Sequence, residues 1–149
     1  MPDINLKPSQ RASIIGAIPP QSAAAVQVSG WLDVTTFHNL MAVVQLGTIG
    51  AAATVDAKIQ QATSNAGAGA KDVAGKAIVQ FTKANADDNK QALINLKHED
   101  LDIANGFKFV QLSITPAVAA SLIAGTVYGF DPRYGQATDN DAATVAQVF

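Results

Sequence analysis

The chain has 149 residues, enough for one domain with its own core. Its net charge of −2 and its 15% share of charged residues argue against a basic nucleic-acid-binding surface and a polybasic membrane-binding patch. Because it has no cysteine, disulfides, thiol catalysis and Cys-based zinc sites are excluded.

Residues 1–21 predict an extended N-terminal arm. They contain Pro2, Pro8, Pro19 and Pro20, and proline removes backbone donors and favours extended geometry in the preceding residue. A frayed terminus is the alternative, but several apolar side chains favour an arm that lies in a groove: Ile4, Leu6, Ile14, Ile15 and Ile18. We therefore expect that removing this segment leaves the rest of the chain folded and weakens its associations.

Residues 22–135 show short strand patterns separated by turn signals at regular spacing. The clearest is Thr54–Thr63, where Val55, Ala57 and Ile59 alternate with polar residues. The other predicted strands are Ala25–Ser29, Asp33–Leu46, Lys76–Thr82, Gln91–Lys97, Phe107–Thr115, which Pro116 is expected to end, and Ala117–Phe130. This pattern predicts an all-β fold, an antiparallel β-sandwich (jelly-roll or Ig-like) of about seven to eight strands, with residues 136–149 as a C-terminal tail.

The uncharged stretch Val110–Phe130 also has the length of a membrane span. Its first half alternates like a strand, it contains Pro116, and no cluster of Lys or Arg flanks it. We expect strands here and no membrane partner.

The glycine-rich stretch Thr63–Lys76 ends in Gly-Lys, as phosphate-binding loops do. Five residues separate Gly69 from Gly75 where the motif has four, and Ala77 replaces the hydroxyl that would hold magnesium. A strand follows instead of a helix. We expect a connection between strands and no nucleotide, and the pattern leaves open whether the segment from Gly67 to Gly75 is ordered.

Residues suited to catalysis or metal binding are sparse. His38 lies in a strand, His98 lies at a charged strand end, and neither has a nucleophile motif nearby. The acidic segments Asp87–Asn89 and Asp139–Asp141 do not continue into a calcium-binding loop and are typical of turns. We expect no catalytic residue, no cofactor and no bound metal, and hence a protein that is not an enzyme.

A few aromatic residues and one arginine remain as candidate interface residues. Trp31 at a strand boundary is either a core or an interface anchor. Arg133 and Tyr134, in FDPRYG, either end the last strand or anchor a partner, because Tyr and Arg are enriched at binding hot spots. Phe149 closes the apolar tip VAQVF.

Three segments carry a family resemblance: GTIGAAATVDAKIQQATSNAGAGAKDVAGKAIVQFT, DDNKQALINLKHEDLDIANGFKFVQLSIT and YGFDPRYGQA. Together they cover roughly residues 43–136, and they resemble small proteins encoded among the head genes of tailed bacteriophages. The resemblance implies a virion protein, commonly a head decoration or cement protein on the capsid exterior. The implied partners are the major capsid protein and further copies of the chain, a homo-oligomer with a trimer as the first expectation.

Two other functional classes stay open. One is a different virion component, such as a tail-tube, neck or head-spike protein. The other is a carbohydrate-binding β-sandwich, although aromatic residues make up only 6% of the chain. No catalytic or ligand-binding residue follows from the resemblance.

Overall fold

A computed structural model describes residues 5–149; Ile4, one of the predicted interface residues, lies outside them. Ten strands make up about half of the described backbone: β1 Ala12–Ala23, β2 Gln27–Val28, β3 Leu32–Asp33, β4 Phe37–Leu46, β5 Thr54–Ala62, β6 Lys71–Ala77, β7 Phe81–Thr82, β8 Gln91–Lys97, β9 Phe109–Ala117 and β10 Ser121–Pro132. The helical elements are short: α1 Pro8–Arg11 and the 3₁₀ turns η1 His98–Asp100, η2 Ile103–Asn105 and η3 Ala137–Asn140.

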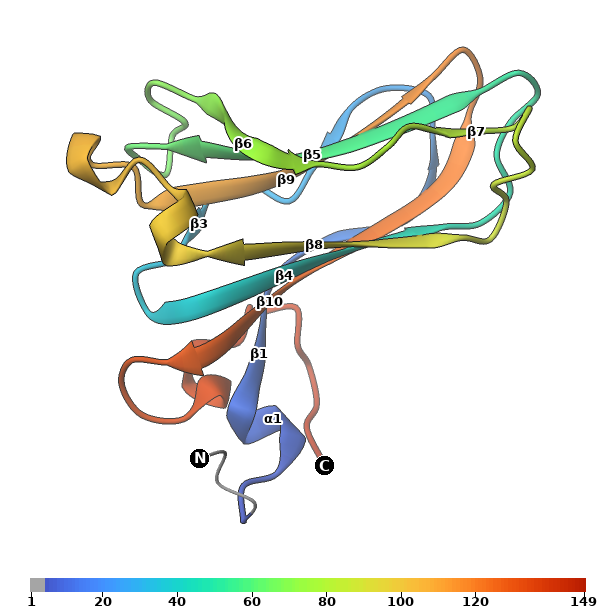
Figure 1. The fold of residues 1–149 in the computed structure, drawn as a ribbon. Helices are drawn as coiled ribbons and strands as arrows, with labels where there is room; N and C mark the ends of the chain where they lie inside the picture. Colours follow the sequence, from blue (N-terminus) through green and yellow to red (C-terminus); the bar gives the residue numbers. More distant parts are fainter. Residues whose placement is uncertain (1–4) are drawn as a thin grey trace.

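The strands form two antiparallel sheets that lie in separate layers (Figure 1). Sheet A has the order β1-β10-β4-β8. Sheet B has the order β2-β9-β5-β6, with β3 continuing β2 along β9 and β7 continuing β6 along β5. Counting each interrupted pair as one strand gives eight strands, four in each sheet, and only the connection between β5 and β6 stays within one sheet. This order is that of a jelly roll, so the predicted β-sandwich is confirmed and the Ig-like alternative is wrong.

The core lies between the sheets because alternate residues of the long strands point inward. In β5, Val55, Ala57 and Ile59 are buried, as their alternation predicts. Their counterparts across the core include Leu40, Ala42 and Val44 of β4, and β9 contributes Val110, Leu112 and Ile114.

Two glycines on the inner face of β10 leave room for large side chains. A Cβ atom on Gly125 would lie 2.8 Å from Leu112 of sheet B, and one on Gly129 would lie 2.7 Å from three ring atoms of Phe37 in the neighbouring strand β4. Phe37 is fully buried, so its ring occupies the space that a side chain at position 129 would need.

The expected N-terminal arm is contradicted by the structure from Ala12 onward. Residues 12–23 form β1, which pairs with β10 along its whole length, and Ile18 is 1% exposed in the core. Prolines 19 and 20 fit because β1 is an edge strand, where a missing N–H breaks no ladder bond. The segment is therefore an integral part of sheet A.

The C-terminal tail is docked along part of its length. Asp141 accepts hydrogen bonds from the Ser13 hydroxyl at 2.7 Å and from the Ile14 amide at 3.1 Å, and the Ala142 amide donates to the Ile14 carbonyl. Helix α1 and the C-terminal tail lie at the same end of the molecule, where β1 and β10 extend beyond the sandwich (Figure 1).

Most strand boundaries differ from the prediction by a few residues, and two of the differences reverse a glycine or proline signal. The strand expected at Lys76–Thr82 is β6, five residues earlier, followed by the short β7. Gly75 has φ of +72° and lies where the β5–β6 register shifts, so it forms a bulge inside the strand and not a loop. Pro116, expected to end a strand, is buried within β9 opposite Val55.

The uncharged stretch from Val110 to Phe130 forms most of β9 and β10. Within residues 5–149, no helix has the length and apolar character needed to cross a membrane.

Candidate functional site

The outer side of sheet A carries a continuous set of apolar side chains. Outward residues alternate with buried ones along β4 and β10, and between Asn39 and Gln45 and between Leu122 and Phe130 none of the outward residues is charged. We call the following set the apolar face: Ile14, Met41, Val43, Leu93, Thr126, Tyr128 and Phe130.

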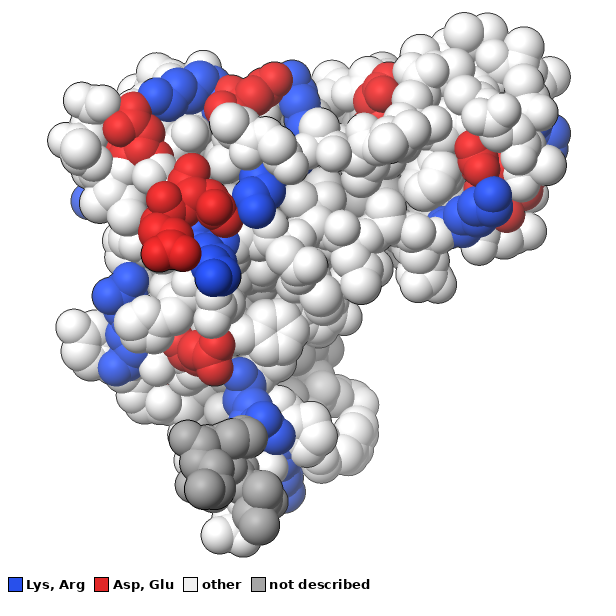
Figure 2. Space-filling view, viewed as in Figure 1, with Lys and Arg blue, Asp and Glu red and all other residues white. Residues whose placement is uncertain are grey.

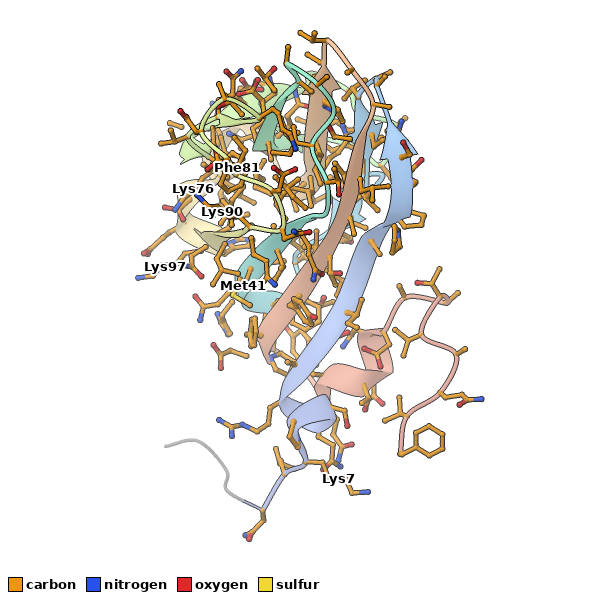
Figure 3. All side chains as sticks on the ribbon, turned by 90° about the vertical axis from the view of Figure 1, so that its right-hand side faces the viewer. Lys7, Met41, Lys76, Phe81, Lys90 and Lys97 are labelled. Carbon is orange, nitrogen blue, oxygen red and sulfur yellow. The ribbon has the colours of Figure 1, made fainter. Side chains whose placement is uncertain are left out.

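Strand register brings these residues into adjacent rows that cross the whole sheet. One row joins Leu93, Val43 and Thr126, and the next joins Met41, Tyr128 and Ile14. The rings of Tyr128 and Phe130 lie 6.2 Å apart on this side. In Figure 3 Met41 lies on the side of sheet A that faces away from sheet B and Phe81. Leu93 is 59% exposed, and the other members are half-buried against one another.

The outer side of sheet B is polar and satisfies its own charges. The Lys58 ammonium lies 2.9 Å from the Asp72 carboxylate, and Gln60 donates a second hydrogen bond to the same group. Hydrogen bonding to Lys58 and then to Gln60 lowers the pKa of Asp72. Further along β5, Asp56 accepts a hydrogen bond from Gln80 at 2.7 Å. This side can stay exposed to water, because these charged and polar side chains already have hydrogen-bond partners in the same sheet or its loops.

The first part of the glycine-rich stretch, residues 63–70, is a turn that packs against Trp31. A Cβ atom on Gly67, which has φ of +80°, would lie 2.5 Å from the Trp31 indole nitrogen. The turn is closed by the Thr63 amide donating to Ala68 and by Ser64 accepting from the Ala66 and Ala68 amides. The predicted strand connection is therefore present in residues 63–70, whereas the rest of the stretch belongs to β6.

The acidic residues hold loops together. Asp87 accepts from the Lys90 ammonium at 2.7 Å and from the Thr82 amide, and Asp88 accepts from the Ile49 amide at 2.7 Å and from Lys83. The hydrogen bond from Lys90 is the main cause that lowers the pKa of Asp87, and the hydrogen bond from the Ile49 amide is the main cause that lowers the pKa of Asp88. Across residues 5–149, no three His, Asp or Glu side chains gather as a metal-binding group.

The two histidines lie at one shallow hollow, together with Arg133 and Glu99. Burial lowers the pKa of His98, and the positive charge of Arg133 lowers it further. Among residues 5–149, the lining of this hollow offers no serine or threonine hydroxyl to either histidine.

The structure does not bring the predicted interface residues together. Ile14 belongs to the apolar face, but Ile18 is in the core, Ile15 packs against the core and Leu6 is half-buried. Trp31 is half-buried on the glycine-rich turn. Tyr134 and Phe149 are 81% and 98% exposed, and Arg133 is exposed beside Tyr134. An interface role for the exposed members stays a prediction.

The prediction from sequence missed most of the apolar face. The available signal was in FHNLMAVVQL, where apolar residues occupy both phases of the alternation: Leu40, Ala42 and Val44 in one, Met41 and Val43 in the other. A strand that is apolar in both phases either is buried on both faces or exposes one apolar face that another molecule can cover.

No family model matches the chain, and no curated protein matches it. Among solved structures, the chain is similar to chains in the structures of infectious bursal disease virus, Gx strain and Gt strain. The identity is 13% in both, and the TM-scores are 0.43 and 0.42. Each similarity covers 92% of this chain and 38% of the viral chain, so this chain spans well under half of their length. Similarities this weak carry no argument about function.

Proposed function

We propose that the chain is a structural protein of a virus particle, a decoration or cement protein of a tailed-phage head. In this role it binds the outside of the shell formed by the major capsid protein, and the apolar face makes the contact. The observation that carries the proposal is the contrast between the outer sides of the two sheets: the outward residues from Asn39 to Gln45 and from Leu122 to Phe130 in the central strands of sheet A carry no charge, whereas the outer side of sheet B is polar and holds the Lys58–Asp72 ion pair. Catalysis, cofactors and metals have no part in it.

Two further observations support the proposal. The resemblance over residues 43–136 points to head genes of tailed phages, and the jelly roll is an architecture that capsid domains use, as lectin domains and cupins also do. Because one fold serves many functions, the argument depends on the surface and not on the fold alone.

The physical mechanism is burial of apolar surface, which favours association by about 25 cal/mol for each Å² removed from water. A patch of this kind holds one copy only weakly, but many copies on a symmetric shell, joined as a homo-oligomer, gain avidity. A trimer would suit the threefold positions of such a shell.

The first test locates the protein. Purified particles of the virus that encodes the chain are analysed by quantitative mass spectrometry and cryo-microscopy. We expect a copy number comparable to that of the major capsid protein and density on the outside of the head. A handful of copies at the tail, neck or a spike would contradict the decoration role, and absence from the particle would contradict any virion role.

The second test uses a matched pair of substitutions. Thr126→Lys places a charge on the apolar face, and Thr115→Lys places the same charge on the outer side of sheet B; both threonines are half-buried in central strands. We expect Thr126→Lys to weaken binding to heads that lack the protein by about tenfold or more, since burying an unpaired charge is costly, and Thr115→Lys to bind like the unmodified chain. Equal effects would remove the apolar face from the contact.

A second candidate function, glycan binding, has one observation in its favour. A hollow of about 580 Å³ at the edge of sheet A places Phe130 and Met41 beside Asn39, Asn95 and Glu99. An aromatic surface next to amide and carboxylate groups is the kind of lining that sugars use. Saturable binding on a glycan array, lost in Phe130→Ala, would favour this function over the first.

A further inference from the structure

Strand β8 forms an edge of sheet A whose outer hydrogen-bonding groups have no partner strand. The Leu46 amide donates to the Lys90 carbonyl, and the register then assigns the ladder bonds with β4 to Ala92, Ile94 and Leu96. The N–H and C=O groups of Leu93 and Asn95 therefore point away from β4. No backbone hydrogen bond from elsewhere in the described chain reaches them.

The opposite edge of the same sheet is protected. Strand β1 has Pro19 and Pro20, two register shifts against β10, and the docked tail bonded at Ile14. Prolines, bulges, covering segments and charged side chains are devices by which proteins prevent edge-to-edge pairing. Strand β8 has seven residues, no proline, an unbroken register with β4 and one charged residue, Lys97, at its end, where it pairs with Glu99.

The charges around β8 allow a second copy as its occupant. Figure 2 shows mostly uncharged surface between a charged group at the left end of the sandwich and a smaller one at the right end. Lys90, which precedes the strand, lies 2.7 Å from Asp87, and Glu99, which follows it, lies 3.6 Å from Lys97, so each end of the strand holds an ion pair. Antiparallel pairing of two identical strands places the ion pair at one end of each copy beside the ion pair at the other end of its partner, so no unpaired like charges meet.

We propose that β8 pairs with β8 of a second copy about a two-fold axis, which joins the two A sheets into one continuous sheet. Such an isologous contact is closed and uses the same residues on both sides. Near the axis it brings together the two exposed Leu93 side chains on the outer side of the joined sheet, where cross-strand apolar pairs are favourable.

The contact is small, because it is one row of seven extended residues about 23 Å long. A single row of this length buries less surface than the about 800 Å² that each partner of a stable interface commonly buries. The pair should therefore form at high concentration in solution and persist where a larger assembly holds copies close together. Its hydrogen bonds lie on the edge of the sheet and it shares only Leu93 with the apolar face, so it does not depend on the proposed function and would link neighbouring oligomers on a shell.

The test is amide hydrogen exchange by NMR together with sedimentation of the full chain over a wide concentration range. The Leu93 and Asn95 amides should slow about tenfold when about nine-tenths of the chain is paired, while the Ile94 amide is protected at every concentration. Exchange at Leu93 and Asn95 that does not change with concentration would overturn the proposal.

Two variants keep the proposal falsifiable. Asn95→Pro removes an outward N–H without breaking a ladder bond, and its control, Asn95→Ala, keeps that N–H. Leu93→Lys places like charges near the axis and does not alter the backbone. We expect Asn95→Ala to pair like the unmodified chain, and Asn95→Pro and Leu93→Lys to stay monomeric. Pairing of folded Leu93→Lys with unchanged affinity would refute the contact even if Asn95→Pro fails to fold.

Discussion

The outer sides of sheet A and sheet B are exposed to the same solvent, yet they have opposite chemistry. Sheet B presents Lys58 and Gln60, which both bond to Asp72, and Asp56, which bonds to Gln80. Sheet A presents Met41, Val43, Tyr128 and Phe130, and no outward residue from Asn39 to Gln45 or from Leu122 to Phe130 is charged. Covering a sheet whose polar groups are already paired brings little favourable free energy, whereas covering an exposed apolar patch removes apolar surface from water and favours association.

The largest expected effect comes from removing residues 1–21, which takes most of β1 from sheet A and leaves sheet B complete. If the two sheets were independent layers, sheet B would survive. Because Ile18 and the buried Ser13 belong to the shared core, we expect the whole chain to unfold, in contrast to the expectation from sequence. Circular dichroism and thermal unfolding measure this.

The matched control removes residues 143–149, which follow the last tail residue bonded to β1. This truncation should unfold at the temperature of the full chain. A folded, cooperative protein without residues 1–21 would show that β1 is dispensable and would restore the description of that segment as an arm.

The next effect compares the inner and outer sides of one strand. Gly129→Val places a side chain in the space that the Phe37 ring occupies. Overpacking of a core in this way lowers the free energy of unfolding by about 1–3 kcal/mol. Thr126→Val, on the outer side of the same strand, should change it by less than about 0.5 kcal/mol. Urea denaturation of both variants gives the comparison; equal losses would mean that the outer side is packed as tightly as the core.

A smaller effect comes from acid, which titrates carboxylates on sheet B and in the loops but none on the apolar face. Hydrogen bonding to Lys58, Lys90 and the Ile49 amide lowers the pKa values of Asp72, Asp87 and Asp88 from their ordinary 3.8. The unfolded chain then binds more protons, so their stabilisation is present above pH 3.8 and is lost as the pH falls through the folded pKa values.

His98 adds an earlier loss in the same direction. Burial lowers its pKa from 6.5, so the unfolded chain takes up a proton first as the pH falls below that value. Melting temperatures measured from pH 7 to pH 3 should decline in two stages, and His98→Gln should remove the first. A melting temperature that rises on acidification would contradict both assignments.

The sequence predicted the parts of the fold that depend on alternation. Strands β5 and β8 appear where the sequence pattern placed them, and Val55, Ala57 and Ile59 of β5 are buried as expected. The pattern failed where backbone geometry overrides it. Gly75 predicted a loop but forms a bulge, and Pro116 predicted a strand end but lies within β9. Both predictions used one residue at a time, whereas the outcome depends on the register of the neighbouring strand.

The candidate surface was harder to predict because it is assembled from distant segments. Ile14, Met41, Leu93 and Tyr128 become neighbours only through the order β1-β10-β4-β8, which no local pattern encodes. The same holds for Trp31 and Gly67, whose contact explains the glycine-rich stretch but joins two parts of the chain far apart in sequence.

The most direct measurement of the central claim is hydroxyl-radical footprinting of the chain free in solution and bound to heads that lack it. The apolar face holds Met41 and Tyr128, whereas Tyr134, 81% exposed, lies outside it. We predict that binding reduces the oxidation of Met41 and Tyr128 severalfold and leaves Tyr134 unchanged. Protection of Tyr134 with unchanged reactivity at Met41 and Tyr128 would contradict the account.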